Sequence, residues 1–340
     1  MSQKQNRTGG FLQSRPALLW ILLLVLLIAS ALFSLFCGRF GLAPSGVVRA
    51  VFMGSESSDL ELNIVRSIRM PRIILVILVG GGLAISGAAF QGIFQNPLVS
   101  PDVLSVSSGS AFGAVLGIML GWPNAGISGL ALLFGVISVI MTYIFAREKG
   151  EVSTLSLVLS GMIMSALFNA LISLMKYVAD TDTQLPAITY WLLGSFSSTT
   201  YKQVRLVLFP ILLGSLVLVA MSNRINVLSL GDEEAYALGI NPVASRAVVI
   251  LGATLVTSAC ITVTGIIGWV GLVIPHISRF LFGPNHTRLI LASALIGAIF
   301  MTLVDLLART ATATEIPVGI LTALIGAPFF AFMFRRRKGV

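Results

Sequence analysis

The sequence predicts an all-α polytopic membrane protein with ten transmembrane helices and one short re-entrant helix. Three observations support this prediction. The 340 residues are 56% hydrophobic and only 10% charged, whereas about a quarter of the residues of a soluble protein are charged. The mean hydropathy is +0.97. The apolar residues also form separate runs, most of them close to the ~20 residues that a helix needs to cross a bilayer.

The first apolar run, residues 17–37, follows the basic residues Lys4, Arg7 and Arg15. No small-residue cleavage site comes after it, so we expect a retained helix rather than a secretory signal. Nine further helices are expected at residues 70–93, 103–120, 125–146, 155–179, 204–222, 245–266, 270–283, 287–308 and 317–334. We treat residues 1–340 as a single transmembrane domain with a first half at 17–179 and a second half at 204–334.

Basic residues set the predicted orientation, because segments inside the cell are enriched in Lys and Arg. The N-terminal basic residues and the Arg335–Lys338 tail place both termini in the cytoplasm. The loop at 226–242 then also lies inside. We therefore read the net charge of +9 as a topology signal and expect no nucleic-acid partner. The exceptions are Arg66, Arg69, Arg72 and Arg309, which fall outside and would meet either an acidic partner or lipid headgroups.

Two stretches interrupt the helical pattern. Gln95–Pro101 follows the second expected helix, and Gly265–His276 separates the seventh from the eighth. Irregular backbone at membrane depth is tolerated where protein buries it or where it lines a cavity, so both stretches are candidates for lining a pathway. The apolar run 187–196 is too short to span and predicts an interfacial or re-entrant helix. Small-residue spacing at Gly109, Gly113 and Gly117 predicts close helix packing.

A short acidic segment stands out between two long apolar runs. Asp232, Glu233 and Glu234 are consecutive, which suits a helix N-terminus. Ser229 and Asp232 have capping-box spacing, and Gly239 followed by Pro242 predicts the end of the helix. With Tyr236 and Leu238 available for contact, the segment is either a helix that presses on a partner or a plain solvated loop.

The chemistry of enzymes is missing from the sequence. No Gly-x-x-x-x-Gly-Lys-Ser/Thr motif occurs, so the chain has no phosphate-binding loop of its own. Neither HExxH nor GxSxG is present, and His276 and His286 are too few for a metal site. We predict no enzymatic activity, no cofactor and no metal ion.

Several motifs in a fixed order resemble a known family. They are Arg69-Met-Pro-Arg72, Ser86–Gln91, Asn96-Pro-Leu98, Ser107-Ser-Gly109, Leu230–Ile240, Gly271–His276, Glu315–Gly319 and Gly326-Ala-Pro328. Together they resemble FecCD-type permease subunits of binding-protein-dependent ABC importers for iron chelates, haem and cobalamin, also called type II importers. The resemblance covers about residues 20–335 and implies that family's ten-helix fold.

The resemblance also implies partners and site residues. The partners are a dimer of ABC ATPases that hydrolyse ATP, a periplasmic or lipid-anchored binding protein, and a second permease copy, identical or paralogous, in the bacterial inner membrane. Coupling to the ATPase falls on Asp232, Glu233, Glu234, Tyr236, Leu238 and Gly239. Docking of the binding protein falls on Arg69, Arg72 and Arg309. The inner gate falls on Asn96, Leu98, Thr154 and Leu155.

The substrate stays open at this stage. An iron chelate, either a siderophore or haem, is the default because it is the most frequent cargo in the family. Cobalamin and molybdate-type oxyanions are alternatives for the same machinery. An ion-coupled secondary transporter is a different class of function, and the scarcity of ionisable residues within the apolar runs argues against it.

Overall fold

The computed structural model describes residues 16–53, 58–148 and 151–338. The topology signals Lys4, Arg7, Arg15 and Lys149 lie outside the described residues. The first part of the chain forms α2 (Pro16–Phe36), α3 (Pro44–Phe52), α4 (Asp59–Leu62), the π-helix η2 (Asn63–Arg69), α5 (Met70–Ile93), the 3₁₀ helix η3 (Pro101–Leu104), α6 (Val106–Met119), α7 (Asn124–Ala146), β1 (Arg147–Glu148), β2 (Glu151–Val152) and α8 (Thr154–Val178).

All regular secondary structure described in the second part is helical. It forms α9 (Gln184–Leu193), α10 (Tyr201–Ala220), α11 (Ser222–Leu228), α12 (Asp232–Ala237), α13 (Pro242–Thr264), α14 (Val270–Phe282), α15 (His286–Thr310) and α16 (Val318–Lys338). In the described part of the chain the only strands are β1 and β2, which pair antiparallel over two residues each. The predicted all-helical membrane fold is therefore confirmed.

Each of the ten predicted spans is helical in the structure. Seven helices are long and apolar enough to cross a membrane by length and composition, namely Ala17–Phe36, Asp59–Ile93, Asn124–Ala146, Thr154–Val178, Tyr201–Ala220, Pro242–Thr264 and His286–Thr310. The other three predicted spans are shorter apolar helices, at Val106–Met119, Val270–Phe282 and Val318–Met333. The count of ten crossings stays a prediction.

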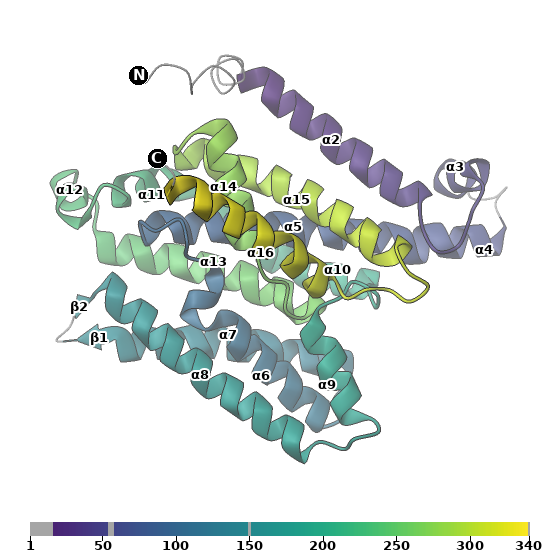
Figure 1. The fold of residues 1–340 in the computed structure, drawn as a ribbon, viewed down its shortest axis with the longest axis horizontal. Helices are drawn as coiled ribbons and strands as arrows, with labels where there is room; N and C mark the ends of the chain where they lie inside the picture. Colours follow the sequence, from purple (N-terminus) through teal and green to yellow (C-terminus); the bar gives the residue numbers. More distant parts are fainter. Residues whose placement is uncertain (1–15, 54–57, 149–150, 339–340) are drawn as a thin grey trace.

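Helix α5 runs through the middle of the bundle (Figure 1). It packs against α15, α13, α14 and α10, and nearly all of its 24 residues are buried. Small residues permit this central position, because a Cβ on Gly80 would collide with the backbone of Gly297 in α15. Close approach of two backbones at such points is how helices gain packing contacts in lipid.

The predicted small-residue face of α6 packs inside the chain. Added Cβ atoms on Gly109, Gly113 and Gly117 would meet Ser138, the Leu130 carbonyl and Ile127, all in α7. This glycine spacing therefore joins two neighbouring helices of one chain.

Both predicted interruptions of the helical pattern are present, and they meet. Gln95 and Ser105 have positive φ angles of 50° and 62° at either end of the first break, and Trp269 has one of 72° in the second. Side chains of Pro101 and Asp102 line the same small pocket as Gly268 and Trp269. Irregular backbone from the two halves is thus packed together in the interior, as expected for segments that protein must cover.

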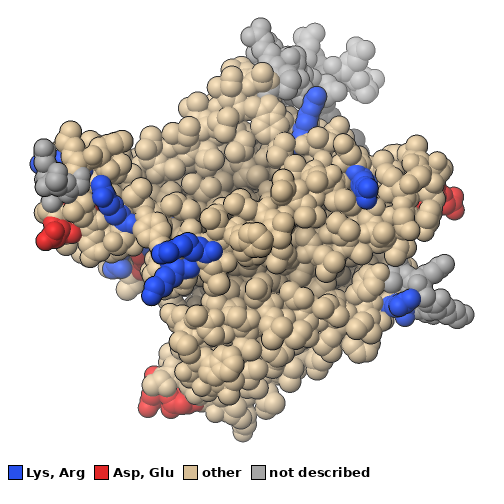
Figure 2. Space-filling view, turned by 180° about the vertical axis from the view of Figure 1, so that it is seen from behind, with Lys and Arg blue, Asp and Glu red and all other residues tan. Residues whose placement is uncertain are grey.

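The sequence pattern did not foresee some local structure. Helices α3 and α4 and the π-helix η2 precede α5, and α11 follows α10 after a single residue, Met221. The short helix expected at 187–196 is present as α9, with bounds Gln184–Leu193. Most of the face shown in Figure 2 is uncharged, with a few separate Lys and Arg side chains on it and the visible Asp and Glu near its edges. That distribution suits a chain surrounded by lipid.

Candidate functional site

At one end of the bundle, α12 projects with its acidic turn first (Figure 1). Asp232, Glu233 and Glu234 form its first turn, where the positive end of the helix dipole favours carboxylates. Ala235, in the same helix, is buried against the rest of the chain. Tyr236 and Leu238 are 58% and 62% exposed. The segment therefore presents an aromatic and an aliphatic side chain outward from a fixed base.

The predicted capping box at Ser229 is wrong. The residue before α12 is Gly231, with φ of 137°, and no side chain caps the helix. Ser229 instead donates a hydrogen bond to the Asn226 carbonyl at the end of α11. Helix α11 continues to Leu228, so Ser229 serves the end of that helix rather than the start of the next. The end of α12 is as predicted, since Gly239 has a left-handed φ of 75°.

An ion pair holds α12 in place. The Arg246 guanidinium in α13 donates to both carboxylate oxygens of Asp232, at 2.8 and 2.5 Å. Two parallel bonds between a guanidinium and a carboxylate fix orientation as well as distance. Asp232, one of the three acidic residues predicted to contact the ATPase, therefore forms an ion pair within its own chain. Glu233 lies exposed beside it in the same turn.

The predicted gate residues lie toward the same end of the bundle. Asn96 accepts a hydrogen bond from the Leu98 amide at 2.9 Å, which stabilises the turn after α5. Leu98 is 46% exposed, and Leu155, in the first turn of α8, is 67% exposed. Thr154 is half-buried at the start of that helix. The apolar side chains of Leu98 and Leu155 are thus both exposed to the surroundings of this chain. The gating role of these residues stays a prediction.

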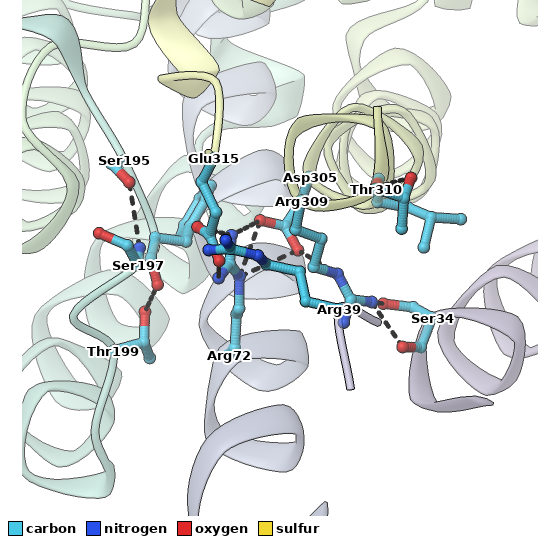
Figure 3. Close-up of polar contacts among 12 residues, drawn as sticks. Ser34, Arg39, Arg72, Ser195, Ser197, Thr199, Asp305, Arg309, Thr310 and Glu315 are labelled. Carbon is cyan, nitrogen blue, oxygen red and sulfur yellow. Dashed lines mark hydrogen bonds and ion pairs between the residues drawn. The ribbon is translucent and has the colours of Figure 1, made fainter. Parts of the chain in front are cut away.

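At the opposite end of α5, Arg72 binds two carboxylates (Figure 3). Its guanidinium contacts Asp305 of α15 at 2.9 Å and Glu315, in the loop after α15, at 3.0 Å. Arg309 lies 3.5 Å from the other oxygen of Asp305, which agrees with the i, i+4 spacing of the sequence. The two arginines and two carboxylates balance in charge.

The remaining contacts tie this cluster to α2. Arg309 donates to the carbonyl and hydroxyl oxygens of Ser34 at 2.5 and 2.6 Å. Arg69 donates to the carbonyls of Leu35, Phe36 and Phe40. The carbonyls of Ser34, Leu35 and Phe36 belong to the last turn of α2, where carbonyls lack partners within the helix.

All three predicted docking arginines are buried. Their exposed fractions are 3% for Arg69, 6% for Arg72 and 5% for Arg309. They do not stand out from the surface. Instead they line a pocket of about 430 Å³ together with Gly38, Arg39, Phe40, Ile64, Ile68 and Glu315. A partner would have to reach into that pocket to touch them. Whether they dock a binding protein stays a prediction.

Sequence reasoning missed two residues of this pocket. Glu315 was noted only as part of a motif, and its partner Arg72 lies 243 positions earlier. Arg39 is exposed at the pocket mouth and donates to the Ala313 carbonyl. The sequence signal that could have revealed Arg39 is its position: it is a basic residue directly after the first apolar run, at the end predicted to lie outside.

Comparisons with known proteins agree with this architecture. The model of the FecCD transport family matches residues 25–336. The molybdate import system permease MolB of Haemophilus influenzae is 40% identical over 96% of this chain and 97% of its own length. A probable iron chelatin transport system permease of Helicobacter pylori is 40% identical over 86% of this chain and 89% of its own.

A solved structure gives the same result for the fold. It is described as an inward-facing conformation of a metal-chelate type ABC transporter, and it is 40% identical. It superposes with a TM-score of 0.86 over 94% of this chain and 99% of that one. The helical bundle, the broken segments and the family match over most of the sequence agree: this chain belongs to the FecCD transport family.

Proposed function

We propose that this chain is the permease subunit of a binding-protein-dependent ABC importer in the bacterial inner membrane. A separate ATPase dimer supplies the energy, and a second permease copy completes the pathway. The basic segments at the ends of the apolar runs support an orientation with both termini in the cytoplasm. In that orientation α12 and the gate residues face inward, and the pocket of Arg69, Arg72 and Arg309 faces outward.

The observation that carries this proposal is the construction of α12. The Asp232–Arg246 ion pair and the buried Ala235 attach the helix to the rest of the chain, while Glu233, Tyr236 and Leu238 are exposed. A short helix does not hold its shape alone in water, so a pre-fixed one with exposed aromatic and aliphatic residues suits transmission of force from a partner. Tyrosine is one of the residue types that most often dominate binding energy at interfaces.

For the cargo we propose an iron chelate, siderophore or haem. The Helicobacter pylori relative is named for iron chelatin transport, and the solved relative is described as a metal-chelate type transporter. A molybdate-type oxyanion is the second candidate, because the MolB relative matches nearly the whole of both chains. The first test of cargo is metal analysis of the binding protein that copurifies with the chain: bound iron supports the first candidate and bound molybdenum the second.

The decisive experiment for the machinery is purification of the tagged chain from its native membrane in mild detergent. Recovery of a P-loop ATPase together with an exported binding protein, with ATP hydrolysis stimulated by that protein, supports the proposal. Recovery of the chain without an ATPase, and uptake that follows an ion gradient alone, would instead indicate a secondary transporter.

A further inference from the structure

Gln95 links the end of α5 to the segment that precedes α12. It is the second residue after α5 and has a left-handed backbone, with φ of 50°. Its side-chain amide donates a hydrogen bond to the Leu228 carbonyl at 2.8 Å. Gln95 immediately precedes Asn96 and lies three positions before Leu98, so this bond begins at the predicted gate.

The acceptor is well placed for such a link. Leu228 is the last residue of α11, and carbonyls in the last turn of a helix lack partners within it. Gln95 supplies one from outside. The first residue of α12, Asp232, follows four positions later. One hydrogen bond therefore joins the gate turn to α11, the helix that directly precedes the α12 segment assigned by the proposed function to the ATPase.

Apolar packing follows the same route. A single cluster of buried residues contains Phe94 and Val99, on either side of the gate turn, together with Ile225 and Leu228 of α11 and Ala235 of α12. Gly92, in the last turn of α5, lies so close to Ile225 that a Cβ there would collide with it. The two segments thus have little freedom to slide independently.

The conformation of Gln95 adds a second argument. Glutamine rarely adopts positive φ, and such residues persist where their surroundings hold them. In the described contacts of Gln95, the side-chain bond to Leu228 and the backbone bond to Gly92 hold it in this geometry. Breaking the first would release the turn that carries Asn96 and Leu98.

We infer that Gln95 is a positioning residue that couples the movement of α12 to the inner gate, through its hydrogen bond to the Leu228 carbonyl. This inference rests on the proposed function, in which an ATPase moves α12. In this inference Gln95 acts through the Leu228 carbonyl and not by contact with cargo or ATPase. Its role requires a hydrogen-bond donor of suitable length, and that requirement separates it from a role in packing alone.

Three variants test the donor. Gln95→Met keeps the length of the side chain and removes the donor. Gln95→Gly removes the side chain but suits the left-handed backbone. Gln95→Lys restores a donor on a flexible stem. As a matched control, Gln184→Met removes the side-chain bond from Gln184 to the Met119 carbonyl, a bond of the same type at the opposite end of the bundle.

The readout is the reactivity of a cysteine at the gate. Leu98→Cys is introduced together with Cys37→Ser, and buried Cys260 is retained. The chain is purified with its ATPase partner, and the rate of modification by a maleimide reagent is measured without nucleotide and after trapping with ATP and vanadate. This measurement needs no knowledge of the cargo.

With Gln95 present, we expect at least a fivefold difference in rate between the two conditions. Gln95→Met and Gln95→Gly should reduce it below twofold while ATP hydrolysis stays within twofold of the parent. Gln95→Lys and Gln184→Met should preserve it. A difference that survives in Gln95→Met, or is lost equally in Gln95→Lys or Gln184→Met, overturns the inference. If the parent shows no nucleotide-dependent difference, position 98 does not follow the ATPase and the inference is overturned, whereas the proposed function fails only if no ATPase copurifies with the chain.

Discussion

Arg72 and Asp305 form a buried ion pair that joins α5 to α15, with 2.9 Å between Nη2 and Oδ1. The two residues are 233 positions apart in the sequence. Glu315 completes the coordination of Arg72, and Arg309 completes that of Asp305. This cluster fixes the end of the bundle that we assign to the outside.

Replacing Asp305 with asparagine should destabilise the fold. Two guanidinium groups would lose their shared buried carboxylate, and breaking a buried pair in this way typically costs about 3–5 kcal/mol. Equilibrium unfolding of the purified chain in detergent measures the effect. Thr310→Val, on the exposed surface of the same helix, is the control and should change stability by less than about 0.5 kcal/mol. A loss below about 1 kcal/mol for Asp305→Asn would contradict the structural role of the pair.

Replacing Tyr236 and Leu238 together with alanine should weaken the complex with the ATPase. Both side chains are exposed on α12, and tyrosine is one of the residue types whose truncation at an interface can cost about 2 kcal/mol or more, so affinity should fall about tenfold or more. Copurification of the ATPase and its ATP hydrolysis measure the loss. Tyr177→Ala is the matched control, because Tyr177 is 88% exposed and lies in the last turn of α8, far along that helix from the gate residues Thr154 and Leu155. Equal ATPase recovery from all three proteins would remove α12 from the interface.

Breaking the Asp232–Arg246 ion pair should loosen the attachment of α12. Exchanging the two charges should restore the ion pair and part of the ATPase stimulation. Arg246→Asp leaves two carboxylates facing each other, so we expect ATPase stimulation to fall severalfold. Asp232→Arg combined with Arg246→Asp brings opposite charges together again and should recover part of the stimulation. Stimulation measured for the two single variants and the double variant forms a double-mutant cycle. Strict additivity in that cycle would show that the pair does not hold the helix.

Arg39→Glu should slow association of the binding protein. Arg39 is exposed at the mouth of the outward pocket, and charges at the rim of an interface act mainly on the association rate. We expect about a tenfold decrease at low ionic strength that shrinks at high salt, measured by surface-immobilised binding kinetics. Arg205→Glu, on the exposed start of α10, should leave the rate nearly unchanged. A decrease independent of salt would argue against electrostatic docking here.

The buried arginines make a direct test of docking harder. Arg69, Arg72 and Arg309 hold carbonyls and carboxylates of their own chain, so charge reversal at these positions would disturb folding as well as docking. Arg39 offers the cleaner experiment for that reason.

Hydropathy and helix-ending residues were sufficient to predict the main helices. The long apolar runs define them, and Gly239 and Gly265 mark helix ends as expected. Pro242, expected only to follow the end of the acidic helix, is also the first residue of α13, three residues before the predicted start. The local prediction at Ser229 failed because α11 continues beyond the apolar run, so that Ser229 belongs to the end of that helix. A spacing rule alone cannot tell which of two adjacent helix ends a serine serves.

The contacts between distant segments were beyond sequence reasoning. Nothing in the order of residues indicates that Arg72 meets Glu315, that Gln95 reaches Leu228, or that Arg246 holds Asp232. Charge placement correctly raised the question of why arginines lie at the predicted outer end. It could not say that their guanidinium groups turn inward to neighbouring helices, because that depends on how the bundle packs.

The central position of α5 has a mechanical consequence. Arg72 lies in its first turn and Gln95 just beyond its last, and a rise of ~1.5 Å per residue separates them by about 35 Å along the axis. A helix interior does not shorten or lengthen readily, because each turn is closed by its own hydrogen bonds. Because α5 is continuously helical from Met70 to Ile93, a displacement of the whole helix along its axis would move the arginine pocket and the Gln95 turn by the same distance.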